Sequence, residues 1–355
     1  MELRMRSENI KRLFETEFPI IQSPMAGVQD SALTIAVCKA GGLGSLPCGM
    51  LSIDKIVDEI RVIKEATAKP YNLNFFCHKM PTYDEKQQST WRDQLNNYFT
   101  EVGVDCEISP RSANRTPFNH DVADAIESTH PEFISFHFGL PDRELLARVK
   151  SWGTKVVSSA TTLEEALWLE SKGVDGIIAQ GLEAGGHRGM FLSDDITTQV
   201  GMSALVPQLV NRVRVPIIAA GGIGDSKGVQ AALLLGASAV QIGTTYLLCA
   251  EAKTSRLHRS ALKNSKSQHT AVTNVFSGRP ARGIVNRVMK ELGYISCYAP
   301  TFPLAGISMA QLRGHFEKLG SDDFSPLWSG QNSSGCKEVS AEALTLLLAT
   351  GLGSS

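Results

Sequence analysis

Short, almost entirely apolar runs alternate along the chain with segments of helical periodicity. Segments such as "DKIVDEIRVIKEAT" and "TLEEALWLESKG" place apolar residues every three or four positions, which predicts helices with one buried face. The apolar runs between them have strand length and carry few charges; they lie at 18–27, 43–47, 71–76, 132–139, 155–160, 175–181, 215–222 and 238–244. Strands that are apolar on both faces are typical of a parallel sheet covered by helices.

Eight strand and helix units in alternation favour a closed (β/α)8 TIM barrel over an open doubly wound sheet. A short internal echo fits this prediction, because "KGVDGIIAQG" and "LGASAVQIGT" share a helix-end glycine, an apolar strand and a following glycine. Two segments break the alternation, at 77–131 and 250–297. We predict a barrel formed by residues 1–250 and about 298–355, with a small, mainly helical second domain at about 251–297 beside the barrel mouth.

The composition and charge of the chain argue against a nucleic-acid-binding, membrane or secreted protein. The chain has 355 residues and a formal net charge of −1, which is unlike the basic footprint of a nucleic-acid-binding protein. The sequence has no run of about 18 apolar residues that would predict a membrane helix, and its charged beginning lacks a signal-peptide core. The seven cysteines form no CxxC pair, so we expect free thiols in a reducing, cytoplasmic location.

The loops after the last two strands predict an anion site. In TIM barrels the catalytic groups lie where the strands end, and the loops after strands seven and eight commonly bind phosphate. Here "GGIGD" offers Gly221 and Gly222, and "QIGTT" offers Gly243 and Thr244. Backbone N–H groups of glycines can approach an anion closely because no Cβ stands in the way. The alternative is that these glycines only make tight turns.

Other strand ends offer groups for a flat ligand. Asn74 and Gln180 carry amides able to pair with the edge of a heterocycle, and Met25 has a soft side chain suited to a ring face. Each could equally serve ordinary loop or core packing.

Two histidines are the candidates for acid–base chemistry. His187 follows the sixth strand in "EAGGHRG", and a neutral imidazole near pH 7 is able to remove a carbon-bound proton. His137 ends the fourth strand and could reach the same space. Glu183 is a weaker candidate base, since a loop carboxylate more often caps a helix. The chain has no GxSxG elbow, phosphate-binding P-loop, metal-ligand spacing or complete Rossmann fingerprint.

An ordered set of motifs resembles the nitronate monooxygenase family, formerly called 2-nitropropane dioxygenase. The set comprises "SPMAGV", "CKAGGLGSL", "NLNFF", "SFHFGLP", "GVDGIIAQGLEAGGHRG", "PIIAAGGI" and "AVQIGTTYLL", and continues to "LWSGQ". The resemblance implies an FMN-dependent barrel that oxidises alkyl nitronates with O2 to a carbonyl compound and nitrite. It also implies His187 as the catalytic base, with His137 as a second matching histidine.

The resemblance assigns flavin contacts to specific positions in this chain: Pro24, Met25, Asn74, Gln180, Gly185, Gly222, Gln241, Ile242, Gly243 and Thr244. Gly221 joins this set from the phosphate argument above. We further expect Gly185 and Gly186 to keep side chains away from the flavin, so that it lies against the loop before His187.

The chain departs from the family where members of this class often carry tyrosines and a lysine. It has Phe302, Gly306 and Ala310 at the comparable places, with Tyr246 and Tyr298 as possible substitutes. This departure leaves the physiological substrate open.

Two other readings stay open at this stage. A related flavin enzyme, such as an enoyl-acyl-carrier-protein reductase or an NAD(P)H:quinone reductase, shares the barrel and similar glycine loops. A non-catalytic barrel that binds a phosphorylated ligand would also use the same phosphate loops. For an enzyme, we expect only small-molecule partners, a nitronate and O2, with no nucleic acid or membrane and with a homodimer as an option.

Overall fold

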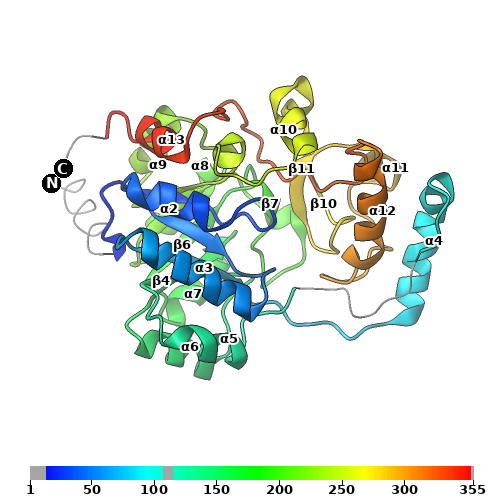
Figure 1. Cartoon of the computed structure of the whole chain (residues 1–355). Helices are drawn as coiled ribbons and strands as arrows, with labels where there is room; N and C mark the ends of the chain where they lie inside the picture. The colour runs from blue at the N-terminus through cyan, green and yellow to red at the C-terminus, as the bar shows by residue number, and fades with distance from the viewer. Residues whose placement is uncertain (1–12, 107–114, 353–355) are drawn as a thin grey trace.

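A computed structural model describes residues 13–106 and 115–352. Eight parallel strands form one sheet in the order β1-β9-β8-β6-β5-β4-β3-β2 (Figure 1). The sheet closes on itself because the N–H of Leu43, just before β2, donates to the carbonyl of Ile20 in β1 at 2.9 Å. The N–H of Gln22 donates back to the carbonyl of Leu43 at the same distance. The predicted TIM barrel is therefore confirmed.

Each barrel strand lies inside a predicted apolar run. The strands are β1 (Ile20–Gln22), β2 (Gly44–Pro47), β3 (Tyr71–Phe76), β4 (Phe133–His137), β5 (Lys155–Ala160), β6 (Gly176–Gln180), β8 (Ile217–Ala220) and β9 (Ala239–Ile242). The helices that follow them in turn are α2 (Ser31–Lys39), α3 (Ile53–Ala66), α5 (His120–Glu127), α6 (Arg143–Ser151), α7 (Leu163–Ser171), α8 (Met202–Val210), α9 (Ser226–Leu234) and α13 (Ala341–Leu348).

Local sequence signals explain where these helices begin and end. The α3 helix begins after Ser52, whose hydroxyl accepts a hydrogen bond from the Lys55 N–H, and it buries Ile56, Ile60 and Ile63 against the barrel. The two glycines of the internal echo, Gly173 and Gly236, have φ of 80° and 105° directly after α7 and α9. Left-handed glycines at these positions terminate the helices and turn the chain into the next strand.

The barrel interior is closed at the end where the strands begin. Leu13 and Phe14 pack there with the inward-facing residues of several strands, among them Phe133, Val157 and Ile178. A plug at this end directs any ligand to the opposite end, where the carboxyl ends of the strands and their loops lie.

A second hydrophobic core lies beside the barrel mouth. It includes Trp91 and Leu95 of α4 (Glu85–Glu101), Val275 and Phe276, and Leu312 of α12 (Gly306–Lys318). In Figure 1 these helices lie together on the right, away from the barrel. The packing thus groups parts of the 77–131 and 298–355 segments with residues of 251–297.

The segment that follows β9 contains strands as well as the expected helices. Helices α10 (Arg256–Lys263) and α11 (Arg287–Glu291) flank strands β10 (Thr270–Thr273) and β11 (Ala281–Ile284). These strands form an antiparallel sheet with the two-residue strand β7 (Gly186–His187), which the sequence analysis did not predict. The segment therefore reaches the loop that carries His187, while the division of the chain into two domains stays a prediction.

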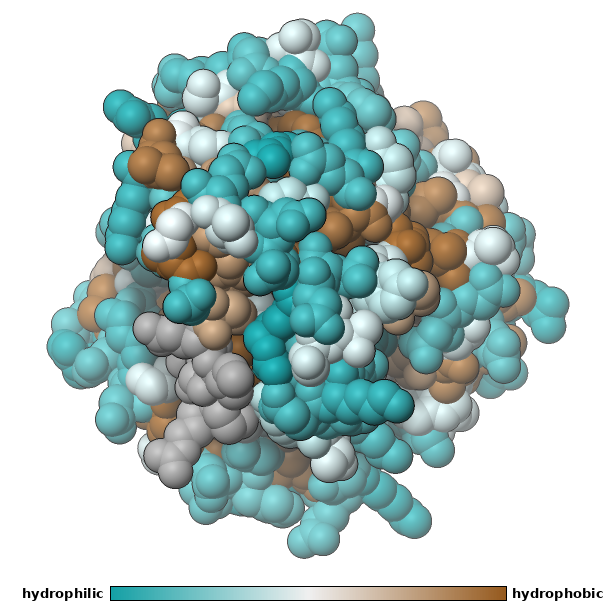
Figure 2. Space-filling model, turned by 90° about the vertical axis from the view of Figure 1, so that its right-hand side faces the viewer, coloured by the Kyte–Doolittle hydropathy of each residue, from teal (hydrophilic) through white to brown (hydrophobic). Residues whose placement is uncertain are grey.

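The outer surface is that of a globular protein with mixed polarity. Figure 2 shows the face on the side of α4 and α12, where hydrophilic residues predominate and hydrophobic ones lie between them. Among the described residues, no helix is both long and apolar enough to cross a membrane.

Candidate active site

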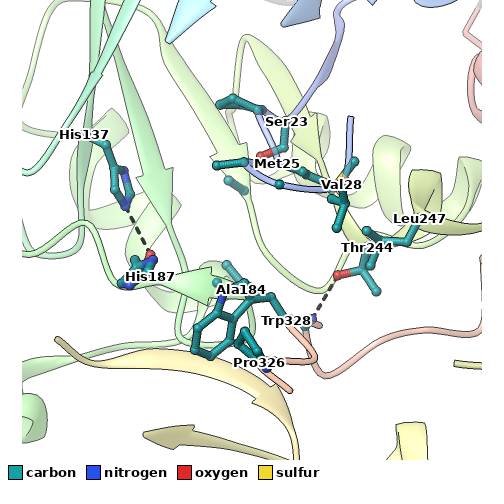
Figure 3. A pocket seen from close by; sticks show the side chains of 18 of the residues that line it. Ser23, Met25, Val28, His137, Ala184, His187, Thr244, Leu247, Pro326 and Trp328 are labelled. Carbon is teal, nitrogen blue, oxygen red and sulfur yellow. Dashed lines mark hydrogen bonds between the residues drawn. The ribbon is translucent and has the colours of Figure 1, made fainter. Parts of the chain in front are cut away.

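One cavity opens at the carboxyl ends of the barrel strands. Its volume is about 260 Å³, near the lower end of the range for small-molecule pockets. All residues assigned to the site from sequence line this cavity: Pro24, Met25, Asn74, His137, Gln180, Gly185, Gly186, His187, Gly221, Gly222, Gln241, Ile242, Gly243 and Thr244. Figure 3 shows the two histidines at one side and Thr244 with Leu247 at the other.

The end near Thr244 presents bare backbone donors. Among the described residues, the N–H groups of Gly221, Gly222 and Gly243 donate to no carbonyl or side chain. Gly221 and Gly222 have φ of 118° and 73°, a conformation that glycine adopts without strain. Successive unpartnered N–H groups at such a turn are the usual donors for a phosphate or other anion.

The hydroxyl of Thr244 lies at the same end. It accepts a hydrogen bond from the Gly330 N–H at 2.9 Å, drawn as a dashed line in Figure 3, which leaves its own proton available to a ligand. The anion end of the cavity thus combines backbone donors with one hydroxyl donor.

The two glycines before His187 are there for different reasons. A Cβ on Gly185 would lie 2.5 Å from the Gly330 nitrogen, so the packing of residues 329–330 alone requires glycine there. A Cβ on Gly186 would meet no atom within 4 Å, although Gly186 lines the cavity. The open space that we expected beside the loop is therefore found at Gly186.

Buried amides fix the cavity wall formed by β1 and β3. The Gln29 side chain accepts a hydrogen bond from the Met25 N–H at 2.8 Å and donates to the Ser45 carbonyl at 2.6 Å, which holds the Pro24–Met25 turn. The Asn74 amide donates to the Ser135 hydroxyl at 2.9 Å. No described residue donates to its Oδ1, so this acceptor is available to a heterocycle N–H.

The Gln180 amide bonds mainly to the protein itself. Its Nε2 donates to the carbonyl of His187 at 2.9 Å, and its Oε1 accepts from the Gly189 N–H at 2.7 Å. Gln180 consequently holds the 187–189 loop in place, with one N–H left for a ligand.

The Arg188 side chain also stabilises the 187–189 loop. This arginine is fully buried and donates to the carbonyls of Gln180 and Gly181 and to the Gln199 side chain, each within 2.9 Å. Hydrogen bonds from Gln180 and Arg188 therefore hold this loop in place.

His137 has both ring nitrogens engaged. Its Nε2 lies 3.1 Å from the His187 carbonyl, the second dashed line in Figure 3, and its Nδ1 lies 3.0 Å from the Ser159 hydroxyl. A carbonyl only accepts, so Nε2 carries the proton and Nδ1 accepts from Ser159. Burial, with smaller effects from Arg279 and Arg188, lowers the pKa of His137 to about 4, so the ring is neutral near pH 7.

His187 directs one ring nitrogen at a serine. Its Nε2 lies 2.8 Å from the hydroxyl of Ser277, whose own closest acceptor is the Arg279 carbonyl at 3.4 Å. Among the described residues, nothing bonds to its Nδ1. In the tautomer in which Ser277 donates to that carbonyl, Nε2 carries the proton and the Nδ1 lone pair is left for a ligand.

Aromatic rings surround the His187 imidazole. The centroids of Phe302, Trp328 and Phe138 lie 5.3, 5.5 and 6.0 Å from it. Burial lowers the pKa of His187 well below its usual value, and the charge of Arg115 adds to this effect. The ring is therefore neutral over the physiological pH range.

Glu183 and the tyrosines Tyr246 and Tyr298 make contacts away from the two histidines. Both oxygens of Glu183 accept from the Met202 N–H, at 3.0 and 2.8 Å, so Glu183 caps α8. Tyr246 is buried against Thr345 and Tyr298 lies at the surface. Within residues 13–106 and 115–352, no cluster of three His, Cys, Asp or Glu side chains is arranged to hold a metal ion.

Among the three positions where the chain departs from the family pattern, Phe302 contacts the site. Gly306 begins α12, and Ala310 is exposed on the same helix. Of the three, Phe302 is therefore the one that packs against His187.

Sequence reasoning missed two parts of the site. Ser277 stands in the "SGRPARG" loop, and only the pairing of β11 with β7 brings this loop to His187. Trp328 and Gly330 belong to "LWSGQ", which crosses the cavity from Ile284 to Glu183 through backbone hydrogen bonds. The "SGQN" composition was the available signal for a close backbone approach, but its partner could not be inferred.

Comparison with known proteins assigns the family. The family profile described as nitronate monooxygenase matches residues 7–349. The chain belongs to the nitronate monooxygenase family. It is therefore an enzyme of the oxidoreductase class, from a family of flavin-dependent proteins.

Individual relatives agree over nearly the whole chain. Nitronate monooxygenase from Pseudomonas aeruginosa is 37% identical over 341 residues, covering 95% of this chain and 97% of that protein. The solved structure of nitroalkane oxidase from Streptomyces ansochromogenes is 35% identical with a TM-score of 0.86, and 97% of each chain is covered. FabK from Thermotoga maritima, at 24% identity and a TM-score of 0.68 over 96% of this chain and 94% of that one, shares the fold.

Proposed function

We propose that the protein binds FMN and uses it, with O2, to convert alkyl nitronates to a carbonyl compound and nitrite. The observation that carries this proposal is the arrangement of one cavity. Unpartnered backbone donors lie at one end, and the free Nδ1 of His187 lies at the other. Family membership supports the reaction type.

The residues present fit a flavin mononucleotide. The N–H groups of Gly221, Gly222 and Gly243 and the Thr244 hydroxyl would hold the phosphate. The Asn74 Oδ1 and the remaining N–H of Gln180 would pair with the ring edge, while Met25 packs against a ring face and Gly186 leaves room beside it. When bound, the flavin supplies the electron transfer and the reaction with O2.

His187 acts on the substrate carbon. In a neutral nitroalkane, its Nδ1 removes the proton next to the nitro group, while its Nε2–H continues to donate to Ser277. A substrate supplied as the nitronate has already lost this proton, so it needs His187 less. The hydrogen bonds from Gln180 and His137 to the His187 carbonyl fix the backbone that carries the base.

The aromatic wall keeps water away from the reacting carbon. Phe302, Trp328 and Phe138 pack against the imidazole, and Phe138 also packs against Phe302, so little solvent reaches this side of the cavity. Exclusion of water strengthens the electrostatic interactions of the substrate with the few polar groups left there.

The cofactor and the reaction are tested together. The purified protein is heated, and the released chromophore is identified by mass; FMN is the expected result. Nitrite is then assayed after ethylnitronate is added in air. A colourless protein would overturn the proposal, and rapid anaerobic flavin reduction by NADH without nitrite formation would favour the reductases instead.

The proposed setting is the cytoplasm. Six of the seven cysteines are free thiols, which fits a reducing compartment: Cys38, Cys48, Cys77, Cys249, Cys297 and Cys336. A homodimer stays a prediction, and sedimentation measurements would test it.

A further inference from the structure

Arg115 is a partly buried cation with no carboxylate partner among the described residues. It lies in the segment between α4 and α5 and lines the cavity. Its Nη1 is buried and has no hydrogen-bond partner, and no described carboxylate forms a salt bridge with the guanidinium. Burial lowers its pKa to about 10, which still leaves it protonated near pH 7. A buried charge without a partner is costly, so its presence points to a ligand.

The other permanent cations of the cavity wall are already paired. Arg313 bonds to Glu317 at 2.7 Å, and Lys253 lies 3.3 Å from Asp30. Glu317 is the one acidic residue among those that line the cavity. Arg115 is therefore the cation of this wall that is left to meet a ligand anion.

The neighbours of Arg115 place it on the His187 side of the cavity. Its guanidinium carbon lies 5.3 Å from the centre of the Phe302 ring, and the His187 ring centre lies 5.3 Å from the same point. The two groups can be no farther apart than the sum of these distances. Because the Arg115 guanidinium and the His187 ring both contact Phe302, a short ligand could reach both of them.

Unsatisfied polar groups gather around the same ring. Both ring nitrogens of His78 are buried, neither makes a well-formed hydrogen bond to a described residue, and the Arg115 backbone lies close to the ring. His78 packs against Phe302 with ring centres 4.7 Å apart. The Nε of Arg279 is also buried and unpartnered, above Phe138. The Arg115 Nη1, the Arg279 Nε and one ring nitrogen of neutral His78 are donors, and an acceptor-rich anion beside this aromatic cluster would satisfy them.

We propose that Arg115 is a specificity-determining residue that binds a carboxylate carried by the nitronate substrate, one short linker from the reacting carbon. The inference rests on the proposed function, whose own test does not involve Arg115. The FMN phosphate is not the anion in question, because its donors lie at the Thr244 end. The planar guanidinium and its free Nη1 suit a carboxylate, which accepts two parallel hydrogen bonds.

The test compares two substrates of equal chain length in the holoenzyme. Propionate 3-nitronate carries the carboxylate, and propyl-1-nitronate lacks it. The wild type is expected to have the higher kcat/KM for propionate 3-nitronate. Arg115→Met is expected to lower this value by about 30-fold or more, while propyl-1-nitronate changes by less than about 3-fold. Arg115→Lys keeps the positive charge but lacks the parallel N–H donors of a guanidinium. Its kcat/KM for propionate 3-nitronate should lie between the values of the wild type and Arg115→Met.

Arg313→Met is the matched control. Because Arg313 itself lines the cavity, Arg287→Met is made beside it: Arg287 is paired with Glu101 at 2.8 Å and does not line the cavity, so this variant should turn over both substrates nearly as the wild type does. A wild type that prefers propyl-1-nitronate, or an Arg115→Met variant that loses both activities equally, overturns the inference. Failure of the wild type to form nitrite from either substrate would instead overturn the proposed function.

Binding of an unreactive anion provides a readout that does not depend on turnover. Succinate is titrated calorimetrically into wild type and Arg115→Met. Binding to the wild type that is weakened at least about 30-fold by the substitution supports the inference, and equal affinity for both proteins contradicts it.

Discussion

The His187 Nε2 lies 2.8 Å from the Ser277 hydroxyl, although 90 residues separate the two in the chain. The pairing of β11 with β7 brings them together. When Ser277 accepts in this hydrogen bond, the proton stays on Nε2 and Nδ1 keeps its lone pair.

Loss of the Ser277 hydroxyl should weaken proton removal selectively. In Ser277→Ala the imidazole is no longer held as the Nε2–H tautomer, and a buried N–H loses its acceptor. We expect kcat/KM for nitroethane to fall by about 3- to 10-fold, in line with the loss of one buried hydrogen bond. The value for ethylnitronate should be unchanged within 2-fold, as measured by nitrite release.

Ser277→Thr keeps a hydroxyl and serves as the control. It should restore most of the nitroethane activity and the pH profile of the wild type. Equal losses on both substrates in Ser277→Ala would show a general structural role and contradict the assignment.

His187→Asn tests the base directly. General-base catalysis typically contributes about 10²- to 10⁴-fold, so kcat/KM for nitroethane should fall within that range. FMN content and turnover of ethylnitronate should be spared to a much greater degree, because this substrate has no proton to remove. Equal loss on both substrates would argue against the base role.

Gly222→Ala probes the phosphate end. With φ at 73°, alanine is strained there by about 1–2 kcal/mol and displaces the N–H groups that face the anion. We expect the purified variant to retain clearly less FMN than the wild type, measured as the flavin-to-protein absorbance ratio. The added Cβ would clash with no neighbouring atom, because the nearest one is the Cβ of Glu183 at 3.4 Å.

Gly153→Ala controls for backbone strain. Gly153 has φ of 84° at an exposed helix end, and its added Cβ would meet nothing within 4 Å. This variant should lose similar stability but keep its FMN. If both variants lose FMN alike, strain rather than the phosphate contact explains the effect.

Buried histidines should make folding stability depend on pH. The pKa of His78, His137 and His258 is about 4 in the folded protein, mainly because of burial, against an ordinary value of 6.5. The unfolded chain therefore takes up protons first as the pH falls. The stability is complete above about pH 6.5 and is lost progressively toward pH 4. Urea unfolding at pH 7, 6 and 5 should show falling midpoints, and a constant or rising midpoint would contradict this.

The barrel could be predicted because its signals are local. Apolar strands and amphipathic helices recur around the barrel, and terminal glycines such as Gly173 and Gly236 follow several of the helices. The closed ring follows from the number of these units. The fold places every strand end at one mouth, so the residues proposed from strand ends were bound to meet there.

The contacts between loops could not be predicted in this way. Strand β7 has only two residues, and its partner β11 lies far along the chain. The roles of Ser277, Trp328 and Arg115 depend on such long-range approaches, which leave no periodic pattern. Gly185 is another example, because only the close packing of residues 329–330 explains why this position must be glycine. The sequence alone does not reveal that contact.

The most direct test of the account follows the flavin spectrum during anaerobic mixing. Propionate 3-nitronate and ethylnitronate are added to the yellow holoenzyme without air, and the absorbance is recorded before air is admitted and nitrite is assayed. We predict rapid loss of flavin absorbance with a nitronate, recovery in air, and stoichiometric nitrite. No spectral change with either nitronate, together with rapid bleaching by NADH, would contradict the account.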